Sequence, residues 1–205
     1  MTQTLPRSYR AVKRAFDIVV SGLALLLLSP VLLAILLAVK VDSPGPAIFS
    51  QFRTGKHGRR FRMWKFRTMV RDAESRKEDI AHLNVLPFPD FKVPDDPRIT
   101  QVGRFLRRTS LDELPQLVNV LVGEMSLVGP RPTSFSASTY DLWHTTRLEV
   151  SPGLTGLWQI NGRHELSTFD ERLRLDIAYV RQMSFRSDLR ILFRTATAVV
   201  RREGA

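Results

Sequence analysis

The longest apolar run of the chain covers residues 18–39 and contains no charged side chain. A helix of about 22 residues rises about 33 Å, close to the thickness of a bilayer's hydrocarbon core. Pro30 interrupts the run, because proline lacks the N–H of a helical hydrogen bond and its ring collides with the carbonyl four residues earlier. Ser29, directly before it, is also pushed away from helical geometry. The pattern therefore predicts two helical halves, near residues 16–28 and 31–41, each too short to cross a membrane alone.

Basic side chains lie on both sides of this run. They are Arg7, Arg10, Lys13 and Arg14 before it, and Lys40, Arg53, Lys56, Arg59, Arg60, Arg62, Lys65, Arg67 and Arg71 after it. Segments rich in Lys and Arg prefer the cytoplasmic side of a membrane. When both ends prefer one side, a helix that enters, breaks and returns is favoured. We therefore expect a re-entrant membrane segment over residues 12–41, broken at Ser29 and Pro30, with a kinked spanning helix as the alternative.

The remaining pattern predicts short elements around one core. Alternating apolar positions over residues 48–66, with a glycine-containing turn at 55–58, indicate a β-hairpin. A polar helix is expected near residues 70–82, a proline-rich loop at 84–98 and a further helix at 99–108. Residues 169–202 predict two amphipathic helices, which could rest on lipid headgroups or face an ordinary core. The expected fold class is α+β and mostly helical, as a single domain over 1–205 whose catalytic part is 42–205.

The amino-acid composition limits which partners and which kinds of site are expected. The chain has 31 Lys and Arg against 20 Asp and Glu, a formal net charge of +11, so nucleic acid, anionic lipid or phosphorylated small molecules are the expected partners. It contains no cysteine, which excludes disulfides, thiolate metal sites and a cysteine nucleophile. Its four histidines have no spacing typical of metal ligands.

The stretch RRTSLDELPQL at residues 107–117 combines two arginines with two adjacent carboxylates. Ser110 and Glu113 match a helix capping box, and Pro115 suits the start of a helix, so the acids could serve the helix alone. The alternative is catalytic. Carboxylates at a helix start stay ionised, and an aspartate can attack phosphorus to form an acyl phosphate.

Such an attack needs cations, because a carboxylate and a diphosphate repel each other. Arg131 lies between Pro130 and Pro132, whose fixed φ angles restrain the backbone that carries it. Lys65 and Arg67 lie in WKFRTM, after the predicted hairpin.

With these residues in place, the chain resembles the bacterial sugar transferases, the monotopic polyprenyl-phosphate phosphoglycosyl transferases. The matching stretches are QFRTG (51–55), WKFRTM (64–69), DPRIT (96–100), RFLRRTSLDELPQLVNVLVGEMSLVGPRP (104–132), PGLTGLWQINGR (152–163) and the D-x-x-Y of Asp176 and Tyr179. They follow in family order over nearly the whole chain, which looks like the minimal catalytic domain.

The resemblance implies an activity. Asp112 would attack the β-phosphate of a UDP-sugar, UMP would leave, and polyprenyl phosphate would take the phosphosugar from the enzyme. Glu113 would help Asp112 to hold Mg²⁺ or would move a proton. The family's conserved cations fall on Lys65, Arg107 and Arg131, which would neutralise the substrate phosphates. Arg67 and Arg163 are further candidate substrate-binding residues, the latter near the uridine if its stretch is not a plain loop.

The same resemblance implies a setting for the protein. It places the protein on the cytoplasmic face of the bacterial inner membrane, at the first membrane step of glycoconjugate or exopolysaccharide synthesis. Anionic lipid is an expected partner, nucleic acid is not, and a homodimer is compatible with the family. Two rival functions stay open at this point, a basic scaffold for nucleic acid or lipid and a one-step transfer in which Asp112 acts as a base.

Overall fold

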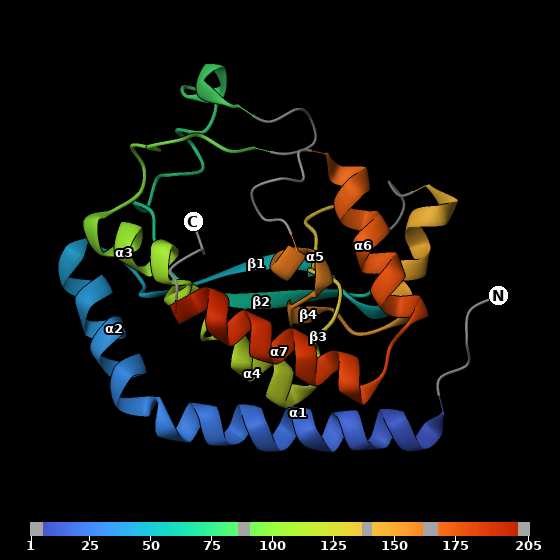
Figure 1. Cartoon of the computed structure of the whole chain (residues 1–205). Helices are drawn as coiled ribbons and strands as arrows, with labels where there is room; N and C mark the ends of the chain where they lie inside the picture. Colours follow the sequence, from blue (N-terminus) through green and yellow to red (C-terminus); the bar gives the residue numbers. More distant parts are fainter. Residues whose placement is uncertain (1–5, 86–90, 137–140, 162–167, 201–205) are drawn as a thin grey trace.

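The computed structural model describes residues 6–85, 91–136, 141–161 and 168–200 (Figure 1). Helix α1 (Arg7–Leu27) runs beneath the rest of the molecule, and helix α2 (Ser29–Asp42) turns away from it by 62° (Figure 1). Pro30 lies in the first turn of α2, and the Ser29 hydroxyl donates to the carbonyl of Leu26 at 2.7 Å, so it satisfies a group freed by the break. The predicted break is confirmed, although α1 begins well before the predicted first half.

By length and hydropathy, no single described helix could span a bilayer, whereas α1 and α2 together could, either as a broken span or as a re-entrant loop. Much of their apolar surface is exposed. Leu26 and Leu27 near the break are 69% and 74% exposed, and Val41 near the end of α2 is 88% exposed. The opposite side of α1 packs on the body of the protein through the buried Asp17 and Ser21 and through apolar side chains such as Phe16 and Val20.

A buried carboxylate, one ion pair and a tyrosine hydrogen bond hold α1 on the body. The Asp17 carboxylate accepts from the backbone N–H of Leu127 at 3.1 Å. Tyr9 and Lys13 donate to the buried Asp188 at 2.9 and 2.8 Å, and Tyr179 donates to the same carboxylate at 2.7 Å. Because buried polar groups are costly when unpaired, these contacts fix where α1 sits.

The predicted hairpin is confirmed. Strands β1 (Ile48–Thr54) and β2 (Arg60–Phe66) pair in antiparallel register, joined by a 3₁₀ turn, η1 (Lys56–Gly58). Asn119 of helix α4 (Gln116–Val122) accepts from the backbone N–H of Trp64 and donates to the carbonyl of Arg62, so α4 is fastened to β2.

A second, parallel pair of strands was not predicted. Strand β3 (Ser126–Val128) pairs with β4 (Gly153–Thr155). A Cβ at Gly153 would lie 2.1 Å from the backbone nitrogen of Gly129, so the two segments approach this closely only because glycine stands there. The pair positions the chain that follows β3.

The other elements surround these sheets. They are the helices α3 (Gln101–Thr109), α5 (Leu157–Asn161), α6 (Phe169–Arg181) and α7 (Phe185–Val200), with the 3₁₀ turns η2 (Ala81–Leu83), η3 (Leu111–Glu113) and η5 (Leu142–Glu149). Two buried clusters form the core, one around Val120, Met125 and Tyr179 and a smaller one around Val39 and Leu106. The α+β, mostly helical class is therefore confirmed.

One of the predictions about helices needs correction. Residues 71–80 form hydrogen-bonded turns rather than a polar helix, and only Ala81–Leu83 is helical, as 3₁₀. The two predicted amphipathic helices are present as α6 and α7. Leu173 and Ile177 of α6 are buried in the core, whereas α7 buries Ile191 and exposes Leu189 and Phe193.

Candidate active site

The two adjacent carboxylates of the LDE turn lie in η3, between α3 and α4. Ser110 ends α3 in the left-handed conformation (φ 57°), which turns the chain sharply before Asp112. The capping box, one of the two alternatives for this stretch, does not form: the Ser110 side chain caps nothing, and α4 begins only at Gln116, after Pro115. Helix capping therefore does not account for either acid.

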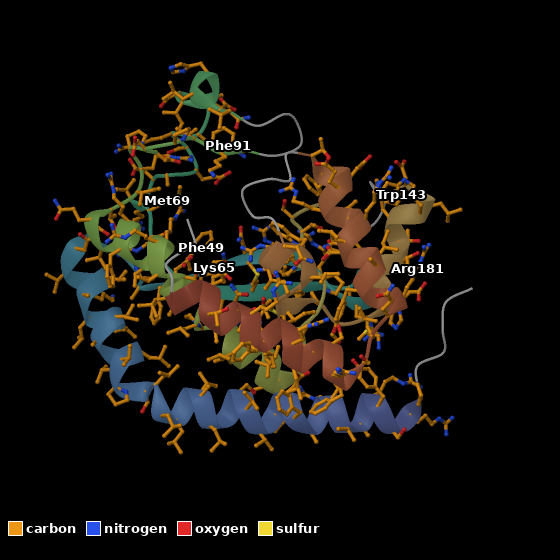
Figure 2. All side chains as sticks on the ribbon, in the orientation of Figure 1. Phe49, Lys65, Met69, Phe91, Trp143 and Arg181 are labelled. Atoms are coloured by element: carbon orange, nitrogen blue, oxygen red, sulfur yellow. The ribbon has the colours of Figure 1, made fainter. Side chains whose placement is uncertain are left out.

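Glu113 is bound by two cations from distant parts of the chain. Lys65, near the end of β2, donates to Oε1 at 3.1 Å, and Arg131 donates to the same oxygen at 2.7 Å and to Oε2 at 3.4 Å. Figure 2 shows Lys65 on the side of the hairpin nearer α3. Burial acts to raise the pKa of Glu113, but Arg131 and Lys65 outweigh it and hold this pKa far below its usual range.

Asp112 has different surroundings. Its side chain is 8% exposed and makes no hydrogen bond to any residue that the structure describes. Burial raises the pKa of Asp112, Glu113 adds to this, and Lys65, Arg107 and Arg131 oppose it. The cluster thus holds one carboxylate that two cations satisfy and one whose oxygens have no partner in the described chain.

Arg107 is the third cation near Asp112. Its Nε donates to the hydroxyl of Thr68 at 2.9 Å, which leaves the rest of the guanidinium available. Burial lowers the pKa of Arg107 from its usual value, while Asp112 raises it. The fold thus brings together Arg107, Asp112 and Glu113 of one stretch with Lys65 and Arg131 from two others.

Arg67 is not in this cluster. Its guanidinium donates to the carbonyls of Pro46, Pro44, Val39 and Ser43 and to the Ser43 hydroxyl, at 2.6–3.3 Å. The expectation that Arg67 meets substrate therefore needs correction, since its donors are committed to the end of α2. The predicted Arg163 lies outside the described residues.

A buried ion pair supports Arg131 and was not predicted. Arg147 donates to Oδ2 of Asp176 through Nε at 3.1 Å and through Nη2 at 2.5 Å. Arg147 Nη2 also donates to the backbone carbonyl of Arg131. Burial raises the pKa of Asp176 to about 6 despite the pairing. The D-x-x-Y motif pointed to Asp176, but no local signal identified Arg147.

A second acidic motif also has a structural use. Asp96 and Arg98 form a buried ion pair at 2.7 Å, and Arg98 donates further to the carbonyl of Ala73. This pair holds the turns after β2 rather than presenting a free carboxylate.

Chemically, the cluster can bind and neutralise a phosphorylated anion beside Asp112, the candidate nucleophile. Three cations surround one unpartnered carboxylate. No group of three or more His, Cys, Asp or Glu side chains in the described chain could hold a metal by itself. Mg²⁺ commonly uses one or two carboxylates and completes its shell with substrate phosphates and water, so Asp112 fits such an ion together with a diphosphate.

Comparison with known proteins gives one family. The model of the bacterial sugar transferase family matches residues 8–202. An undecaprenyl-phosphate galactose phosphotransferase of Salmonella typhimurium is 47% identical over 204 residues, which cover 97% of this chain and 42% of that protein. A UDP-glucose:undecaprenyl-phosphate glucose-1-phosphate transferase of Escherichia coli is 46% identical over 198 residues, 91% of this chain and 39% of that protein.

A shorter relative matches over most of its own length. The exopolysaccharide production protein ExoY of Rhizobium meliloti is 41% identical over 198 residues, 94% of this chain and 87% of that protein. The chain thus spans less than half of the two longer relatives. Because the family model matches almost the whole chain, the chain belongs to the bacterial sugar transferase family.

Proposed function

We propose that the chain transfers a sugar 1-phosphate from a UDP-sugar to a polyprenyl phosphate, with Asp112 as the nucleophile. The observation that carries this proposal is the contrast between the two carboxylates: Glu113 is satisfied by Lys65 and Arg131, whereas Asp112 has no partner in the described chain. A partly desolvated carboxylate that is not tied down is suited to attack phosphorus. The names of the Salmonella and Escherichia relatives, which specify undecaprenyl phosphate, support the acceptor.

The reaction balances in two displacements. A carboxylate oxygen of Asp112 forms a bond to the β-phosphorus of the donor, the bond from that phosphorus to the α–β bridging oxygen breaks, and UMP leaves with the electron pair. An oxygen of the polyprenyl phosphate then attacks the same phosphorus, and the bond to Asp112 breaks to restore the carboxylate. The products are UMP and polyprenyl-diphosphate-sugar.

The cations have separate tasks in this scheme. Arg107 and Arg131 neutralise the phosphate oxygens on which charge builds up. Glu113 orients Lys65 and Arg131, and its strongly lowered pKa makes it a weak proton acceptor. When bound beside Asp112 and Glu113, Mg²⁺ would screen the diphosphate charge.

Release of UMP tests the activity. Purified protein is incubated with a panel of UDP-sugars and Mg²⁺, with and without polyprenyl phosphate. We expect UMP in amounts above the enzyme concentration only when the acceptor is present. Absence of release for every donor would overturn the proposed activity.

Trapping of the covalent phosphosugar distinguishes the two-step transfer through Asp112 from a one-step transfer. Without acceptor, a UDP-sugar labelled in its β-phosphate should leave label on a peptide that contains Asp112. If label never stays on the protein although turnover is normal, the transfer occurs in one step and Asp112 acts otherwise.

We also propose that α1 and α2 form a re-entrant segment on the cytoplasmic side of the inner membrane. The chain has no cysteine, so single cysteines in place of Ser8 and Lys40, both exposed, report their own accessibility. A membrane-impermeant maleimide should label both positions in inverted vesicles and neither in intact spheroplasts. Labelling from opposite sides would establish a spanning helix.

A further inference from the structure

A cationic cavity lies away from the Asp112 cluster. It has a volume of about 360 Å³ and is lined by the first half of α1, the end of α4, the start of β3, residues 149–151 and the end of α6. None of the five residues of the Asp112 cluster lines it. Figure 2 shows Arg181, which lines this cavity, well apart from Lys65 of the cluster.

Cationic side chains outnumber carboxylates around the cavity. The cations are Arg10, Lys13, Arg14, Lys56 and Arg181, and the carboxylates are Asp17 and Glu149. Asp17 is already used by the N–H of Leu127, and Glu149 is exposed. The lining therefore carries an excess of positive charge, which attracts anions.

Two of these cations are fixed by the fold. Lys13 pairs with Asp188 at 2.8 Å, and Arg14 donates to the carbonyls of Val120 and Leu121 at the end of α4, at 2.7 and 2.8 Å. These contacts hold the first half of α1 against the cavity, so its positive side chains keep a defined position.

The other three cations have no such role. Among the described residues, Arg10, Lys56 and Arg181 make no hydrogen bond or ion pair through their side chains. They come from α1, η1 and α6, and so converge on the cavity from three elements. Like charges brought together without an anion repel each other, and a bound anion would remove that cost.

A buried hydroxyl adds independent support. Ser126 lines the cavity, its side chain is 2% exposed, and its Oγ has no hydrogen-bond partner in the described chain. A buried hydroxyl without a partner is costly, and a phosphate oxygen would accept its proton.

The position along α1 indicates where the anion comes from. Lys13 and Arg14 lie about one turn before Ile18, from which the exposed apolar side chains of α1 follow closely through Leu23 to Leu27. If that surface enters lipid, the cavity lies at the depth of the headgroups, where lipid phosphates are concentrated. A phosphodiester has the charge and acceptor oxygens that the cavity lacks.

We propose that this cavity binds the phosphodiester headgroup of an anionic membrane phospholipid and thereby fixes the first half of α1 at the membrane surface. The site is separate from the one that holds the two substrates. The inference rests on the proposed membrane location but not on the proposed chemistry. Binding without turnover therefore tests it independently.

The test measures thermal protection of the detergent-solubilised full chain by dihexanoyl-phosphatidylglycerol. A ligand that binds only the folded state raises the unfolding midpoint as its concentration rises. The cavity variant is Arg10→Gln with Arg181→Gln. The matched control is Arg174→Gln with Arg190→Gln, which removes the same charge from exposed positions outside the cavity.

We expect wild type and control to be protected alike, and the cavity variant to need at least about tenfold more lipid for the same shift, since two charge-assisted contacts are lost. Lys56→Gln alone should give a smaller change in the same direction. The donor half-reaction, UMP release without acceptor, should be unchanged in the cavity variant.

Three outcomes would overturn the inference. Equal protection of cavity variant and wild type would show that the lipid binds elsewhere. Equal protection by dihexanoyl-phosphatidylcholine would remove the need for a net anion. Equal protection by inorganic phosphate at the same concentration would identify a free phosphate, rather than a lipid, as the occupant. Absence of UMP release by the wild type would instead count against the proposed chemistry. The thermal-protection measurement would still test lipid binding, because it does not depend on turnover.

Discussion

Replacing Asp112 with asparagine is expected to lower the rate of UMP release by at least about 10³-fold, because an amide oxygen cannot form the acyl phosphate. The change is nearly isosteric. It also removes a buried charge that has no partner in the described chain, so the unfolding midpoint should stay equal or rise. The rate of UMP release and the unfolding midpoint, measured on the same preparation of the variant, check the two parts of the prediction.

The matched control is Asp79→Asn, which makes the same chemical change at an exposed position and should keep full activity. Asp112→Glu should also be slow, by about 10²-fold, because the longer side chain shifts the attacking oxygen by more than the site tolerates. Turnover of Asp112→Asn near the wild-type rate would remove Asp112 from the reaction.

Replacing Arg147 with alanine is expected to cost roughly 3–5 kcal/mol of folding free energy, because it leaves the charge of Asp176 buried and unpaired. Both side chains of this ion pair are at most 3% exposed. Chemical denaturation in detergent measures the loss. The exposed pair of Arg76 with Asp72 supplies the control, and Arg76→Ala should cost less than about 0.5 kcal/mol.

The same substitution should impair catalysis through Arg131. Arg147 donates to the Arg131 carbonyl, so its loss frees the backbone that aims the guanidinium at Glu113. Arg147→Met with Asp176→Leu removes both buried charges and should recover most of the stability, but not the rate. If that double variant regains the full rate as well, the ion pair is only a packing element and does not position Arg131.

Elements whose backbone is decided by local chemistry can be predicted from the sequence. Pro30 cannot donate the helical hydrogen bond and so bends or breaks the helix, and the turn at 55–58 between alternating strands gives a hairpin. Side-chain positions cannot be predicted in this way where distant contacts compete with a local pattern. Ser110 and Glu113 fit a capping box, yet Lys65 and Arg131 bind the glutamate instead. For Arg67, a position beside the WKF motif suggested substrate, but four backbone carbonyls near the end of α2 take its donors.

The sequence by itself determined the broken helix pair, the hairpin, the adjacent acids and the family, since each of these is written in a short stretch or in the order of such stretches. Only the tertiary structure decided which acid stays without a partner, which arginine supports Arg131 and which cations surround the cavity beside α1. These features join residues that are far apart in sequence. Glu113 is 48 positions from Lys65 and 18 from Arg131, and Arg147 is 29 positions from Asp176. Such contacts depend on how the strands and helices pack, and the resulting burial shifts the pKa values of the ionisable side chains. No local pattern could therefore specify them.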